Sequence, residues 1–150
     1  MNKWEKFSRT GPGAQECFEA FDSKVKNKVL NYIKKKCIKE NPDNYGPDLV
    51  LKLPNREPLP IEVQIDTYWG REGYSIQRFL IPLRKERLKE YPNCQIWIVS
   101  HDLSMGAIIP VNKLTDDRKV FTPNKYRPDE ISFSIPINEC RIFSLSTLQE

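Results

Sequence analysis

Histidine, long apolar runs and paired cysteines are scarce in this sequence. Among its 150 residues there is one histidine, His101, which argues against a histidine-ligated zinc site and against Ser-His or Cys-His relays. The longest apolar run, Ile96 to Val99, is far shorter than the roughly 20 residues of a membrane-spanning helix. The four cysteines have no CxxC spacing and the first residues have no apolar signal segment, so we expect reduced thiols in the cytoplasm or another reducing compartment.

Charged residues are plentiful and unevenly distributed. They make up 29% of the chain, aromatic residues make up 11%, and the net charge is +4, a composition typical of a folded globular protein. The length predicts one domain. The basic surplus lies in the first two thirds of the chain and suits an anionic partner such as nucleic acid, although many proteins without such a partner share it.

The order of predicted elements indicates an α/β sandwich with a central mixed sheet. Apolar residues recur at helical spacing from about 14 to 40, and a second helix is expected over 75–91. We expect a core over about 13–111, with C-terminal strands over 112–150 that complete or elaborate the sheet. The strands expected from short apolar or alternating runs are 49–53, 61–66, 95–99, 107–111, 118–121, 131–137 and 140–145.

The strand 61–66 carries the polar residues of greatest chemical interest. Ile61, Val63 and Ile65 alternate with Glu62, Gln64 and Asp66, a pattern most often found where one sheet face is exposed. If this strand forms a hairpin with 49–53, Asp48 approaches the polar face around Glu62. Two carboxylates and the Val63 carbonyl would form an all-oxygen site suited to Mg²⁺ or Mn²⁺, which can activate water for attack on a phosphate.

Pro47-Asp48, followed fourteen residues later by Glu62-Val63-Gln64, resembles the bipartite signature of the PD-(D/E)XK nuclease superfamily. Because Gln64 stands where that family usually has lysine, the chain resembles the ExQ variant, as in CoiA-like competence nucleases. The resemblance implies a restriction-endonuclease-like sandwich with an αβββαβ-type core flanked by helices. It also implies a Mg²⁺-dependent nuclease in which Asp48, Glu62 and the Val63 carbonyl bind the metal and Gln64 orients the water.

The same resemblance suggests further residues for the site. A first-helix acid would be Glu16, with Glu19 as the alternative, although acids are also common in a first helical turn for electrostatic reasons. The missing lysine charge would come from the metal or from a cation on the next helix, Lys85 or Arg84.

Aromatic and basic residues near this strand are candidates for nucleic-acid binding. Tyr68, Trp69 and Arg71 could stack on bases and contact phosphates, while Trp69 could equally fold back onto the core. Arg78 and Lys85 lie in the expected basic helix. The predicted partner is nucleic acid, with DNA favoured, and cutting of both strands would suit a homodimer.

Three functions remain open at this point. The first is a metal-dependent nuclease, and the second is a catalytically inactive nucleic-acid-binding module on the same fold. In the third, a structural or interaction protein, 61–66 is only an amphipathic edge strand.

Overall fold

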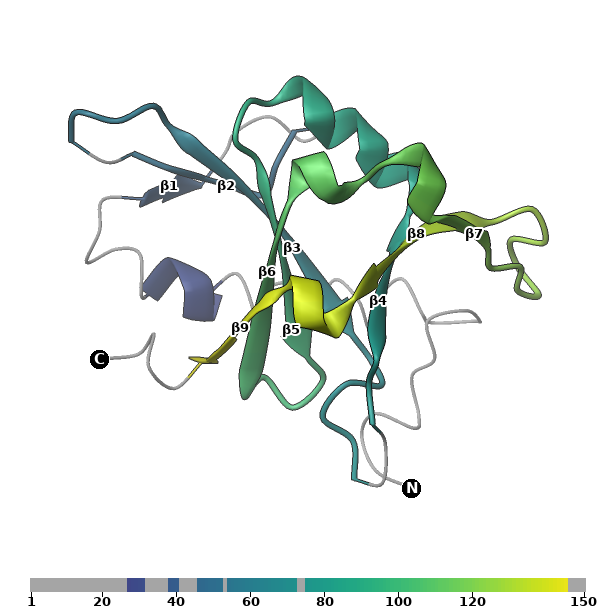
Figure 1. Ribbon diagram of the computed structural model, residues 1–150. Helices are drawn as coiled ribbons and strands as arrows, with labels where there is room; N and C mark the ends of the chain where they lie inside the picture. The colour runs from purple at the N-terminus through teal and green to yellow at the C-terminus, as the bar shows by residue number, and fades with distance from the viewer. Residues whose placement is uncertain (1–26, 32–37, 41–45, 53, 73–74, 146–150) are drawn as a thin grey trace.

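Two β-sheets and a few short helices make up the part of the chain that the computed structural model describes (Figure 1). The described residues are 27–31, 38–40, 46–52, 54–72 and 75–145. The fold is mixed α/β, rich in strands and poor in helix, which agrees with the predicted class at that level. In these described ranges, no helix is long and apolar enough to cross a membrane.

The larger sheet has six strands in the order β1-β2-β3-β5-β6-β9. Their bounds are β1 Ile38–Glu40, β2 Leu49–Leu51, β3 Leu59–Asp66, β5 Gln95–Ser100, β6 Met105–Pro110 and β9 Arg141–Ser144. Strands β3 and β5 run parallel, whereas all other neighbours in this sheet are antiparallel. The expected mixed sheet is therefore present.

A second, antiparallel sheet has the order β4-β8-β7, with β4 Arg78–Pro82, β7 Lys119–Phe121 and β8 Ile131–Pro136. The presence of this sheet shows that the prediction of a single helix over 75–91 is wrong. Residues 78–82 form β4, and only Leu83–Glu90 are helical, as the 3-10 helix η1. Burial alternates along β4, and the strand pairs with β8 more than 50 residues away, so tertiary pairing overrides the local helical pattern.

The first predicted helix also ends earlier than expected. Residues 27–31 are helical, but Ile38–Glu40 form β1, so the helix does not continue to Glu40. Its N-terminal part, including Glu16 and Glu19, lies outside the described residues. The predicted strands are all found, with ends shifted by at most two residues. Besides η1, the described residues form three short 3-10 helices, Val111–Lys113, Asp116–Arg118 and Ile137–Glu139.

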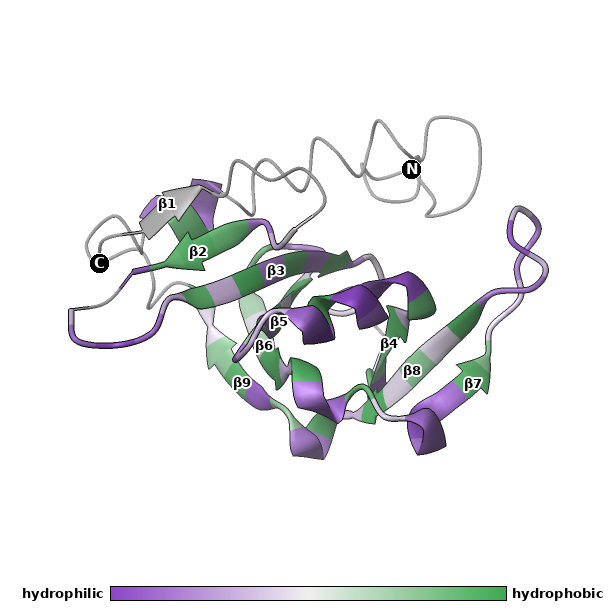
Figure 2. Ribbon diagram, turned by 90° about the horizontal axis from the view of Figure 1, so that it is seen from above, coloured by the Kyte–Doolittle hydropathy of each residue, from purple (hydrophilic) through white to green (hydrophobic). Residues whose placement is uncertain are grey.

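Apolar side chains cover both faces of the six-stranded sheet. On one face Ile61, Val63 and Ile65 pack with Val29 of the short helix. On the other face Ile96 and Ile98 pack against Phe79 and Phe133 of the second sheet. In Figure 2 the hydrophobic colour lies on strands of both sheets, including β2, β4 and β8, while η1 is largely hydrophilic.

The polar residues of β3 point into the layer between the two sheets. Glu62 and Gln64 pair in register with Ile96 and Ile98, which belong to that layer. Glu62 is only 3% exposed, and Gln64 and Asp66 are each 9% exposed. The common expectation for such alternation, a solvent-exposed face, is therefore wrong, because the second sheet and η1 cover it.

Candidate active site

Asp48 and Glu62 are brought together by the hairpin of β2 and β3. Leu49 pairs with Ile61 in the antiparallel register, so the residue before β2 lies opposite Glu62. Asp48 Oδ2 accepts a hydrogen bond from the backbone N–H of Val63 at 2.8 Å, which fixes the carboxylate against β3. The Asp48 and Glu62 carboxyl groups are also hydrogen-bonding neighbours.

Lys85 on η1 completes this group of charges. Its Nζ donates to Glu62 Oε2 at 2.5 Å, and the side chains of Lys85 and Glu62 are only 16% and 4% exposed. Arg84, the other candidate cation, points elsewhere: its side chain is 53% exposed, and Nη1 lies 3.8 Å from Glu130 Oε1. Of the two cations considered from the sequence, Lys85 is the one that reaches the acids.

Burial dominates the electrostatics of Glu62. Removal from water raises the pKa of its carboxyl to about 7, and the charge and hydrogen bonding of Asp48 act in the same direction. Lys85 opposes the shift by attraction and hydrogen bonding. The site thus brings a buried carboxyl group and a half-buried one together, and a cation interacts strongly with the buried one.

The side-chain amide of Gln64 forms a hydrogen bond through its nitrogen but none through its oxygen within the described residues. Nε2 donates to the Leu80 carbonyl of β4 at 3.1 Å, which ties β3 to the edge of the second sheet. Oε1 is buried and accepts no hydrogen bond within the described structure. Since rotating the amide would set its oxygen against the Leu80 carbonyl oxygen, the donor end is fixed on β4 and the acceptor end remains for another group.

The donor chemistry of this group fits a hard divalent cation. Carboxylate oxygens of Asp48 and Glu62, with the Val63 carbonyl, are the ligand types that Mg²⁺ and Mn²⁺ prefer. Among the residues that the structure describes, no cluster of three or more His, Cys, Asp or Glu side chains is placed to hold a metal. The described protein therefore provides two acidic ligands, and a metal would share Glu62 with Lys85.

Cys94 was not singled out by the sequence, yet it borders this site. Burial, together with the charges of Glu62 and Asp48, raises the pKa of its thiol to about 12. A thiol with so high a pKa remains protonated at neutral pH and is a poor nucleophile.

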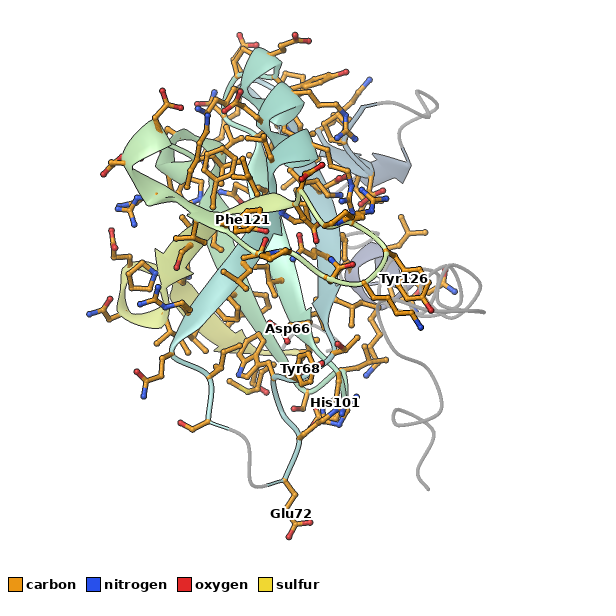
Figure 3. All side chains as sticks on the ribbon, turned by 90° about the vertical axis from the view of Figure 1, so that its right-hand side faces the viewer. Asp66, Tyr68, Glu72, His101, Phe121 and Tyr126 are labelled. Carbon is orange, nitrogen blue, oxygen red and sulfur yellow. The ribbon has the colours of Figure 1, made fainter. Side chains whose placement is uncertain are left out.

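The predicted nucleic-acid contacts are scattered. Trp69 is buried, with its ring 5.1 Å from that of Phe79, so it belongs to the core and is not available for stacking on bases. Tyr68 is 50% exposed and the Arg71 guanidinium lies 5.2 Å from its ring centre. Figure 3 shows Tyr68 near Asp66 and His101, at the C-terminal end of β3.

Two further placements concern β3 and β4. The Asp66 carboxylate accepts from the backbone N–H groups of Tyr68 and Trp69 at 2.9 and 3.0 Å, a local structural role. Arg78 lies on β4 and not on a helix, and its Nη1 donates to Ser134 Oγ at 2.9 Å. The strand β3 ends at Asp66, four residues or roughly 13 Å beyond Glu62, and Tyr68 lies in the turn that follows, so the exposed aromatic of this loop lies away from the acids.

Sequence reasoning missed two exposed aromatic residues in the C-terminal third. Phe121 is 67% exposed and Tyr126 is 49% exposed. A basic residue adjoins Tyr126 on either side, which is the sequence signal that could have drawn attention to it.

Comparison with known proteins adds no relationship to this geometry. No family model matches the sequence, and no curated protein matches it.

Proposed function

We propose that the protein is a metal-dependent nuclease of the PD-(D/E)XK superfamily that hydrolyses phosphodiester bonds of DNA, on a restriction-endonuclease-like fold. The meeting of Asp48, Glu62 and Lys85 between two sheets carries this proposal. Two acids can hold a metal ion and a cation can stabilise charge on a phosphate, and here these three residues come from three separate segments of the chain. The Gln64 amide lies on the same face of β3 as Glu62.

Each residue has a defined role in the proposed reaction. Asp48, Glu62 and the Val63 carbonyl hold Mg²⁺ or Mn²⁺, which when bound activates water and neutralises charge on the phosphate. The free amide oxygen of Gln64 accepts a hydrogen bond from the attacking water and orients it. Lys85 supplies the positive charge that a neutral amide cannot, and stabilises the phosphate oxygens as negative charge develops.

Conservative substitutions at three positions test these roles. Asp48→Asn keeps an acceptor for the Val63 N–H, Glu62→Gln keeps the shape of the side chain, and Lys85→Met removes only the charge. Each should lower Mg²⁺-dependent cleavage of DNA by about 100-fold or more, because each removes a charge that acts in the transition state. Cleavage is followed on labelled single-stranded and duplex DNA with Mg²⁺ and with Mn²⁺.

Two matched controls accompany these variants. Glu57→Gln removes an exposed acid of the loop before β3, and Lys89→Met removes a lysine from the same 3-10 helix as Lys85. Both should cleave like the parent protein, and circular dichroism should show that all five variants are folded. Full activity in Asp48→Asn or Glu62→Gln would contradict the assignment.

A second candidate function is a nucleic-acid-binding module without catalysis. It is favoured by the presence of only two acidic ligands among the described residues. In that case the parent protein would bind DNA in EDTA and cleave none with either metal.

In the nuclease proposal, cutting of both strands of a duplex needs two sites, so two copies of the chain act together.

A further inference from the structure

The hairpin of β7 and β8 exposes two large aromatic side chains that the core does not require. Its loop, residues 122–130, projects from the second sheet at the right of Figure 1. Phe121 ends β7 and is 67% exposed, while Tyr126 in the loop is 49% exposed. Figure 3 labels both rings on this hairpin. Aromatic residues are enriched at binding interfaces relative to the rest of a protein surface.

The loop is held in shape by its own hydrogen bonds. Asn124 Oδ1 accepts from the backbone N–H groups of Tyr126 and Arg127 at 3.0 and 2.9 Å. Asn124 Nδ2 donates to Glu130 Oε2 at 2.7 Å, and the Thr122 N–H donates to the Glu130 carbonyl at 2.8 Å. Since these bonds involve polar groups only, the exposed Tyr126 ring is presented on an ordered loop without contributing to the bonds that order it.

Basic residues flank Tyr126, and two arginines line a neighbouring groove. Lys125 Nζ lies 5.7 Å from the centre of the Tyr126 ring, and Arg127 follows directly. Arg127 and Arg84 line a groove of about 320 Å³ between the hairpin and the start of η1. The groove also contains two acids, Asp129 and Glu130, and Glu130 is engaged by Arg84 and Asn124.

One side of this groove is formed by the first residues of η1, the helix that also carries Lys85. Arg84 is adjacent to Lys85, whose ammonium group lies on Glu62. A nucleic-acid strand whose phosphates contact Arg84 and Arg127 would have its bases beside the hairpin and would lie against η1. Aromatic rings accept bases of any sequence by stacking, but only bases that are not already paired in a duplex.

We propose that the β7–β8 hairpin binds an unpaired stretch of DNA, with bases stacked on Phe121 and Tyr126 and phosphates held by Lys125, Arg127 and Arg84. This inference rests on the proposed nuclease function and refines it, because it defines the substrate as DNA with single-stranded character next to the cleavage site. Pairing of the exposed edge strand β7 with a second copy of the chain is the alternative use of this surface.

Binding without cleavage tests the inference. Fluorescence anisotropy in EDTA compares a labelled single-stranded DNA, its blunt duplex and an RNA of the same sequence. Phe121→Ala combined with Tyr126→Ala should weaken single-stranded DNA binding about tenfold or more, because one stacked base is worth roughly 1–3 kcal/mol. Duplex binding should change by about twofold or less. Tyr126→Phe should bind normally, because it keeps the ring.

Ile142→Ala is the matched control, since it truncates another exposed apolar residue, on the edge strand β9 of the other sheet. It should bind like the parent protein. The inference is overturned if the parent protein does not bind single-stranded DNA, if it prefers RNA, or if the double variant loses duplex binding equally. It is also overturned if the double variant binds normally but changes from dimer to monomer in light scattering.

Failure of this inference is distinguishable from failure of the nuclease proposal. Binding is read from the hairpin variant and cleavage from Asp48→Asn, so the two proposals are tested on different residues. Loss of binding in the hairpin variant, with no cleavage by any variant, would support the hairpin and contradict the nuclease. Normal binding by the hairpin variant, together with cleavage that depends on Asp48, would contradict the hairpin proposal and support the nuclease.

Discussion

At the scale of single residues, Glu62 illustrates what alternation along a strand does and does not indicate. The hairpin placing Asp48 beside Glu62 follows from the turn and the alternating strand, and was predictable. The burial of Glu62 was not, because an exposed polar face and one covered by a second sheet have the same local pattern. The cover comes from β4, β8 and η1, whose packing over β3 depends on contacts distant in sequence.

The raised pKa of Glu62 makes stability depend on pH. The carboxyl has a pKa of about 7 when folded, against 4.5 for the ordinary group, so the folded state binds more protons between these values. Stability from this group is therefore full below about pH 4.5 and is lost as the pH rises through about 7, by up to roughly 3 kcal/mol.

Urea unfolding in EDTA at several pH values measures this effect. The unfolding free energy of the parent protein should fall relative to that of Glu62→Gln as the pH rises through this window. Parallel curves for the two proteins would show that the pKa of Glu62 is not raised. Glu57→Gln, which removes an exposed acid, should follow the parent protein.

At the scale of elements, the strands with the clearest apolar pattern were predicted best. Those now seen as β3 and β5 were both identified, because one alternates cleanly and the other is a continuous buried run. The helix expected over 75–91 failed at Phe79 and Ile81, whose spacing of two residues places them on one face of a strand but on opposite sides of a helix. Both are buried, and the strand is completed by pairing with β8, far along the chain.

The contact between β6 and β9 leaves no room for a side chain at Gly106. Gly106 pairs with Phe143, and a Cβ built on it would lie 2.5 Å from Phe143 Cζ. The Phe143 ring is also held against Trp97, with ring centres 5.4 Å apart. We expect Gly106→Ala to destabilise the protein by about 1–3 kcal/mol, as overpacking does.

A double-mutant cycle checks the cause of this loss. The cost of Gly106→Ala, measured by urea unfolding, should be much smaller in a Phe143→Ala background, where the obstructing ring is absent. An equal cost in both backgrounds would assign the loss to the strand backbone instead.

At the scale of the whole molecule, the second sheet acts as the cover of the site. Phe79 and Phe133 of this sheet share a core with Ile96 and Cys94, and this core also contains Trp69. The C-terminal third contributes β7 and β8 to the cover and β9 to the larger sheet. Its strands were predictable from short apolar runs, but their division between two sheets was not, because no local signal specifies which strand becomes a partner.

Cys94 reports whether this cover opens separately from the rest of the protein. The thiol is 1% exposed and its pKa is raised to about 12, so it should react with a thiol reagent only after the sheets separate. Labelling of Cys94, followed by peptide mass spectrometry in increasing urea, should coincide with the change in tryptophan fluorescence. Labelling at clearly lower urea would mean that the cover lifts before global unfolding.

The fixed amide of Gln64 has a consequence for selectivity. Its NH₂ group is committed to the Leu80 carbonyl, and only a carbonyl oxygen remains to meet whatever enters. This oxygen can accept a hydrogen bond from a hydroxyl, an amine or water, but it repels an oxyanion that carries no proton. A group bound beside this oxygen must therefore carry a hydrogen-bond donor. A nucleophilic water meets that requirement and an unprotonated phosphate oxygen does not, so the two bind at different positions.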